Sequence, residues 1–192
     1  MSGSGNPPRV PLLSAEEARV AAEEVGLPQA LAELNVFRVL LHQPVAAKAL
    51  SDLLLALLFR GRLDDRLREL VIMRIGWATG SDYEWTQHWR IAQESFGCSA
   101  EDLLALRDWR RSDRFGPAER AVLAATDETL ETGTLSAETW AACEAHVGGD
   151  VERVELVTAI GVWRLVSQLA RSIEIPLEDG VASWPPDGEG PQ

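Results

Sequence analysis

Apolar residues in this chain recur at the spacing of an α-helix between glycine and proline breaks, and they nowhere alternate as in a β-strand. Between residues 64 and 79, for example, Leu67, Leu70, Val71 and Ile75 recur at helical spacing. Capping residues delimit other segments of the same kind. We expect helices over residues 14–25, 30–41, 44–60, 64–79, 83–96, 99–108, 117–131, 136–146 and 151–173. The predicted fold class is all-α, a single domain of about eight or nine helices.

The two ends of the chain differ in composition from the predicted helical domain over residues 12–178. Residues 1–11 and 179–192 are rich in glycine, proline and serine, which predicts flexible tails. Trp184, which precedes two prolines, is unusual in such a segment. It could dock on the body of the protein or on a neighbouring subunit, or it could lie in a disordered tail.

The net charge, the apolar segments and the cysteine content indicate which partners and which compartment to expect for this protein. The net charge is −12, so phosphate-rich nucleic acids and anionic membranes would repel the chain. The longest strongly apolar run, residues 53–59, is too short to span a bilayer, and residues 1–11 lack the apolar core of a secretory signal. The two cysteines, Cys98 and Cys143, match no zinc or disulfide-exchange spacing. We therefore expect a reduced, cytoplasmic protein that binds neither nucleic acid nor membrane.

The densest cluster of chemically useful residues lies over residues 83–89. Glu84 and His88 are four apart on the predicted helix, so a carboxylate and an imidazole can touch, as a general acid/base site requires. Trp85 and Trp89 form a second such pair, which could wall a substrate pocket. Each pair also has an ordinary structural explanation. Glu84 and His88 could form a solvated contact on the helix surface, and Trp85 and Trp89 could be part of the hydrophobic core. Glu69, on the preceding helix, could fold back towards the pair.

These residues carry a family resemblance. The run LDDRLRELVIMR over residues 63–74, followed by Tyr83-Glu84-Trp85 and His88, resembles the carboxymuconolactone decarboxylase family and its relative alkyl hydroperoxidase D. The similarity extends more weakly from Asn35 to Pro176. Hydroperoxidase relatives carry a Cys-x-x-Cys-x-x-x-His motif, with a glutamate on the helix before it. Matching on the histidine puts His88 at the motif histidine and Glu69 at the glutamate, and Ser81 and Glu84 then stand where the two cysteines should be. Because neither residue can act as a thiol, the resemblance implies the decarboxylase branch.

The resemblance implies a cofactor-independent lyase or isomerase that acts on a small conjugated, carboxylated or lactone-like substrate, in aromatic catabolism or secondary metabolism. His88 would donate and accept the proton, Glu84 would orient it, and Glu69 would be a second acid/base. The candidate substrate-binding residues are Trp85, Trp89, Tyr83, Arg38 and Arg74. The family also implies a homo-oligomer, a trimer or hexamer, with no metal and no cofactor.

Three other functions remain open at this point. The chain could be a non-catalytic helical oligomer that binds a small ligand. It could be a metal-dependent enzyme, although two carboxylates and one histidine supply only three ligands. It could also be a thiol peroxidase that uses Cys98 or Cys143, although neither lies at the motif spacing.

Overall fold

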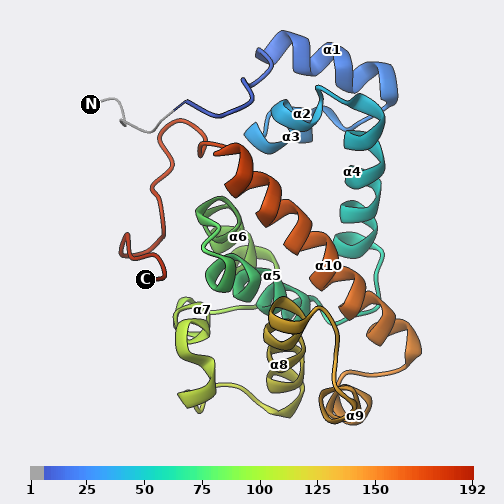
Figure 1. The fold of residues 1–192 in the computed structure, drawn as a ribbon, viewed down its shortest axis with the longest axis vertical. Helices are drawn as coiled ribbons and strands as arrows, with labels where there is room; N and C mark the ends of the chain where they lie inside the picture. Colours follow the sequence, from blue (N-terminus) through green and yellow to red (C-terminus); the bar gives the residue numbers. More distant parts are fainter. Residues whose placement is uncertain (1–6) are drawn as a thin grey trace. The chain divides into compact units, whose positions relative to one another are not determined.

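The computed structural model describes residues 7–192, and within that range it contains helices and no β-strand (Figure 1). The all-α prediction is therefore confirmed. The helices are α1 (Ala15–Val25), α2 (Gln29–Ala32), α3 (Asn35–Leu40), α4 (Pro44–Phe59), α5 (Asp65–Thr79), α6 (Asp82–Ser95), α7 (Ala100–Ala105), the 3₁₀-helix η1 (Leu106–Arg111), α8 (Pro117–Thr132), α9 (Ala137–His146) and α10 (Asp150–Ile173).

The chain forms two compact units, and the predicted domain over residues 12–178 stays a prediction. The first unit extends to Arg60 and includes Leu169–Val181; the second comprises Gly61–Gln168 and Ala182–Gln192. Helix α10 is continuous and contributes to both units. The predicted N-terminal tail lies partly in residues 1–6, outside the described residues.

In the first unit, one helix predicted over residues 30–41 is in fact two. The chain becomes extended at Leu34, with φ −75° and ψ 135°, between α2 and α3. Asn35, the first residue of α3, explains the break, because its side-chain amide donates to the carbonyl oxygens of Pro176 and Leu177. Its backbone N–H donates to the Glu178 carboxylate at 3.0 Å. These bonds to a distant segment replace the helical bonds that local propensity favours.

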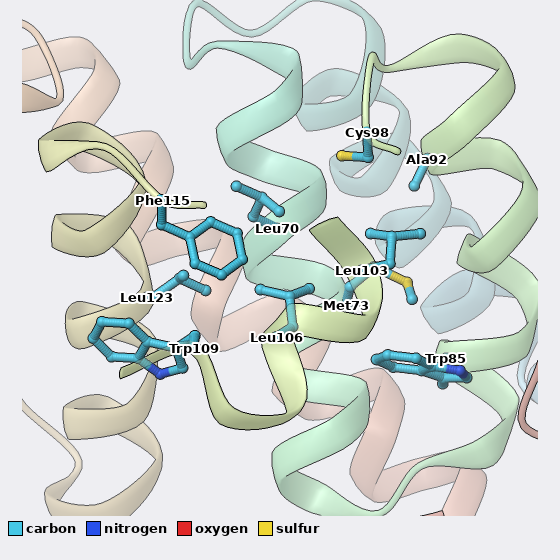
Figure 2. Packing of buried hydrophobic residues seen from close by; sticks show 10 residues of the cluster. All are labelled: Leu70, Met73, Trp85, Ala92, Cys98, Leu103, Leu106, Trp109, Phe115 and Leu123. Carbon is cyan, nitrogen blue, oxygen red and sulfur yellow. The ribbon is translucent and has the colours of Figure 1, made fainter. Parts of the chain in front are cut away.

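In the second unit, α5 is the central helix and packs against α6 and α8. Every residue from Leu67 to Met73 is buried, and so are Ile75 and Gly76. Its apolar side chains share a core with residues of neighbouring elements, which Figure 2 shows converging from several helices. This core contains Leu70, Met73, Trp85, Ala92, Cys98, Leu103, Leu106, Trp109, Phe115 and Leu123. Since α5 is surrounded, its charged residues must find partners inside the protein.

Helices α5 and α6 approach each other closely at Gly76. A Cβ atom at this position would lie 3.0 Å from the backbone nitrogen of Trp85 and 3.3 Å from its Cα. The turn between the two helices is closed by Gly80, whose left-handed φ of 68° ends α5. The absence of a side chain at Gly76 thus lets α6 lie directly on α5 and brings residues 84–88 against residue 69.

The C-terminal segment does not have the conformation that its composition predicts. Residues 182–192 belong to the second unit and contact it through specific hydrogen bonds and an ion pair. The Trp85 indole N–H, for example, donates to the carbonyl oxygen of Pro185 at 2.8 Å. Of the alternatives for Trp184, the structure shows docking on the body of the protein. Among the described residues, no helix combines the length and the apolarity needed to cross a membrane.

Candidate active site

Glu69 of α5 and His88 of α6 form a buried hydrogen bond. The distance between His88 Nδ1 and Glu69 Oε2 is 2.9 Å, the Glu69 side chain has no exposed surface, and that of His88 is 13% exposed. A carboxylate accepts, so Nδ1 carries the proton and Nε2 is the nitrogen left for chemistry. The sequence predicts Glu84 as the orienting partner of His88. That assignment changes, because the structure gives the bond to Glu69, 19 residues away.

Glu84 lies one helical turn before His88 and is also buried, at 4% exposure. Its Oε2 atom has no hydrogen-bond partner in the structure. Burial raises the pKa of Glu84 from 4.5 to about 7; the His88 charge opposes this rise and the Glu69 charge adds to it. Glu84 therefore changes its protonation state near neutral pH.

The pKa of His88 is raised as well. Burial alone would lower it, since an imidazolium loses its hydration, but the charge of Glu69 and its hydrogen bond outweigh that effect. Glu84 raises the His88 pKa further and Arg68 lowers it. Below this raised pKa, the site holds an imidazolium bonded to Glu69 beside a carboxyl group that can carry or release a proton.

Two further residues belong to the site although the sequence does not single them out. Arg68 is 2% exposed; its guanidinium lies 4.7 Å from the centre of the Phe96 ring, and its Nε is 3.7 Å from Glu69 Oε1. The sequence does contain one indication that Arg68 is buried. Residues 70–73 are four consecutive apolar residues, which cover every face of the helix and so indicate that it is surrounded. Trp163 of α10 lies edge-on to His88, with ring centroids 6.2 Å apart, and no local pattern predicts that contact.

The tryptophans predicted to wall a substrate pocket, Trp85 and Trp89, are part of the hydrophobic core or pack against it. Trp85 is fully buried in the core, and it packs on Trp77 and Trp89 with ring centroids 5.3 and 5.6 Å away. Together with Trp184 these residues form what we call the tryptophan cluster. Tyr83 is buried at 4% exposure. The aromatic ring that contacts the imidazole is Trp163.

The two arginines predicted to bind a substrate carboxylate are used in other contacts. Arg74 donates to both carboxylate oxygens of Asp127, at 2.6 and 3.1 Å, and to the Leu106 carbonyl at 2.8 Å. It also lies about 140° round α5 from Glu69. Arg38 belongs to the first unit, where it donates to the Leu13 carbonyl and to the Asn35 side chain. Both guanidinium groups thus support the fold.

The thiols of the chain lie in surroundings that disfavour the reactive thiolate. Cys98 and Cys143 are buried, and neither forms a disulfide. Burial raises the pKa of the Cys98 thiol to about 12 and also raises that of Cys143. Ser81, at one motif-cysteine position, is completely buried. In the part of the chain that the structure describes, no three His, Cys, Asp or Glu side chains are grouped as metal ligands.

Comparison with known proteins agrees with this architecture. Residues 44–128 match the model of the carboxymuconolactone decarboxylase family. A protein of unknown function from Agrobacterium tumefaciens whose name carries the designation AhpD is 25% identical; the match covers 71% of this chain and 94% of that protein, with a TM-score of 0.63. No curated protein sequence matches the chain.

Two further solved structures share the fold at lower identity. An alkylhydroperoxidase AhpD core protein from Ralstonia eutropha is 18% identical, with coverage of 92% and 95% and a TM-score of 0.73. The debrominase Bmp8, as a cysteine-to-alanine variant in complex with 2,3,4-tribromopyrrole, is 17% identical, with coverage of 85% and 84% and a TM-score of 0.66. The predicted resemblance and the alkyl hydroperoxidase D-like fold are therefore confirmed.

Proposed function

We propose that this chain, whose residues 44–128 match the model of the carboxymuconolactone decarboxylase family, is a cofactor-independent lyase or isomerase. Its substrate would be a small conjugated molecule with a carboxylate or lactone group. The observation that carries the proposal is the buried arrangement of Glu69, Glu84 and His88, in which one carboxyl group is bonded to the imidazole and the other has an oxygen without a partner. A site of this kind can move protons near neutral pH.

The proposed chemistry assigns one task to each of the three side chains. Loss of carbon dioxide leaves an electron pair that moves into a conjugated carbonyl group, and a carbon atom must then be protonated. His88 supplies that proton from Nε2, while Glu69 holds Nδ1 and stabilises the imidazolium. Glu84, with its pKa of about 7, is the second acid/base. The roles of the two glutamates are thus exchanged relative to the sequence prediction.

The debrominase neighbour supports one part of the proposed substrate class, a small conjugated molecule. Its complex contains a small conjugated ring, 2,3,4-tribromopyrrole. This chain has Ser81 and Glu84 where hydroperoxidase relatives have their two cysteines, and its own thiols are buried. We therefore propose proton transfer rather than thiol–disulfide exchange as the reaction type.

The test begins with a thermal-shift screen over conjugated lactones and keto acids, followed by measurement of substrate loss for each compound that binds. His88→Ala should lower turnover about 10²- to 10⁴-fold, because the general acid is lost. Glu69→Gln should lower it less, since an amide can still hold Nδ1. The matched control is His146→Ala, on the exposed surface of α9, which should retain full activity.

Far-UV circular dichroism must show the same helical content in all three variants. Full turnover in a folded His88→Ala protein would contradict the acid–base role. A compound that binds beside His88 without being converted would instead support the alternative of a non-catalytic ligand-binding protein. In that case His88→Ala would lose binding of the compound, and there would be no turnover to lose.

A further inference from the structure

The segment over residues 182–192, which we call the C-terminal strap, is fixed to the first part of α6. Both carboxylate oxygens of Asp82 bond to it: one accepts from the backbone N–H of Trp184 at 2.9 Å and the other from the Ser183 hydroxyl at 2.6 Å. The Trp184 N–H also lies 3.2 Å from the Thr86 hydroxyl oxygen. With the bond from Trp85 to Pro185, the strap contacts three of the first five residues of α6.

The Trp184 indole completes the tryptophan cluster. Its ring meets Trp77 edge-on, with centroids 5.8 Å apart, and lies 6.2 Å from the ring of Trp85. The end of the strap folds back onto the indole, so closely that a Cβ atom at Gly190 would lie 2.9 Å from its Cε2. The partly buried Trp184 thus contacts both the body of the unit and the end of its own segment.

An ion pair fastens the other half of the strap. Two guanidinium nitrogens of Arg107, in η1, donate to the two carboxylate oxygens of Asp187 at 2.7 and 2.9 Å. The same guanidinium lies 4.7 Å from the ring centre of Trp77 and 5.5 Å from that of Trp85. The bidentate pair and the stacked arginine join the strap, the tryptophan cluster and η1 in one contact network.

We propose that the C-terminal strap positions the candidate active site, with Trp184 as the positioning residue that holds the first turns of α6 and with them Glu84 and His88. Glu84 lies between the strap contacts at residues 82 and 85, and His88 lies two residues, about half a turn, beyond the contact at residue 86. A release of the strap loosens this part of α6 and admits water to Glu84. This proposal rests on the proposed function only in that it treats Glu84 and His88 as active-site residues.

The test compares Trp184→Ala with Trp184→Phe and Trp140→Ala in the full chain. Trp184→Ala should speed amide hydrogen exchange about tenfold or more both in residues 183–190 and in residues 82–88, with α8 unchanged. The pKa of Glu84, followed by carbon-13 NMR of its carboxyl group, should fall from about 7 towards 4.5 as the site hydrates. Trp184→Phe keeps a ring in place and should stay near the wild type. Trp140, on α9 and 38% exposed, is the control for loss of an indole.

Two results would overturn the proposal. One is faster exchange in the strap with no change in α6 or in Glu84; the other is a strap that stays protected in Trp184→Ala. If that variant does not fold, Asp187→Asn provides the same comparison through the ion pair. Because exchange and titration need no substrate, a failure of the proposed enzymatic function leaves this test unaffected.

Discussion

Glu69, Glu84 and His88 share one buried location, and their charges cannot all be present without cost. An ionised Glu84 carries the largest cost, because it is buried and its Oε2 atom has no hydrogen-bond partner. The imidazole bonds to Glu69, and burial raises the pKa of Glu84 to about 7. One proton is therefore held at Glu84 over part of the neutral range, and a proton in such a place is available for transfer.

This protonation predicts a dependence of stability on pH. Between pH 4.5 and about 7 the unfolded chain has released the Glu84 proton and the folded protein retains it, so the free energy of unfolding falls as pH rises through this window. The contribution of Glu84 should be about 3 kcal/mol smaller at pH 8 than at pH 4.5. Glu84→Gln should remove most of this fall, as measured by urea unfolding at both pH values.

His88 acts in the same direction and remains in the variant. Its pKa is raised in the folded state, so its contribution is complete below pH 6.5 and is lost as pH rises through the folded value. A residual slope in Glu84→Gln is thus expected. The control is Glu94→Gln, in an exposed pair with Arg90, which should keep the wild-type slope. An unchanged slope in Glu84→Gln would refute the assignment.

The sequence predicts part of this arrangement and could not predict the rest. The proximity of Glu84 and His88 is local, because a helix brings residues four apart together. The bond from His88 to Glu69 depends on how α6 packs on α5, and the contact with Trp163 joins residues 75 positions apart. The burial of Arg68 also follows from tertiary packing. The residue types of the site could thus be found from the sequence, but not the partners.

Among the helices, the crossing of α5 and α6 determines where the site forms. Gly76 permits the close approach, and a methyl group there meets backbone atoms that cannot rotate away. Gly161, in α10, offers a contrast because a Cβ atom at that position meets nothing within 4 Å. Both glycines lie inside helices, so the same substitution gains the same helix propensity, about 1 kcal/mol, at each.

Gly76→Ala should therefore destabilise the protein by about 1 to 2 kcal/mol, since overpacking outweighs the gain in propensity. Gly161→Ala should stabilise it by about 0.5 to 1 kcal/mol. Urea unfolding of both variants and the wild type measures the difference. Equal effects of the two substitutions would show that α5 and α6 can separate without loss, and that their contact does not position Glu84.

Helix boundaries were predictable where local signals decide them. Ser14 with Glu17 forms a capping box at the start of α1, and Gly26 ends that helix in a left-handed conformation. The split between α2 and α3 was not predictable, because Asn35 bonds to residues more than 140 positions away. Helix α10 reads as apolar on most of its surface, yet Val154 is 64% exposed while Ile160 is fully buried. Its long apolar pattern did not reveal which face is buried.

Over the whole molecule, the similarity of fold does not extend to the two thiol positions of the hydroperoxidase motif. The chain shares its helical architecture with proteins named for alkyl hydroperoxidase D at 25% identity or less, and it differs from the hydroperoxidase motif at both thiol positions. The predicted homo-oligomer, a trimer or hexamer, stays a prediction. The C-terminal segment shows the limit of composition as a guide, since a stretch rich in glycine and proline is held by the Trp184 ring, the Asp187 ion pair and hydrogen bonds to α6.

The last prediction concerns the thiols of the whole chain. Cys98 and Cys143 are its only cysteines, and burial raises the pKa of both. A double Cys98→Ala, Cys143→Ala variant should retain full turnover of any substrate found in the screen, and the folded wild type should react with a thiol reagent far more slowly than the protein in urea. The two buried sites would lose only small side-chain contacts, costing about 1 kcal/mol each. Peroxide reduction by the wild type that disappears in the double variant would instead establish thiol chemistry. Ser81 and Glu84, which stand at the motif positions, can form neither a sulfenic acid nor a disulfide.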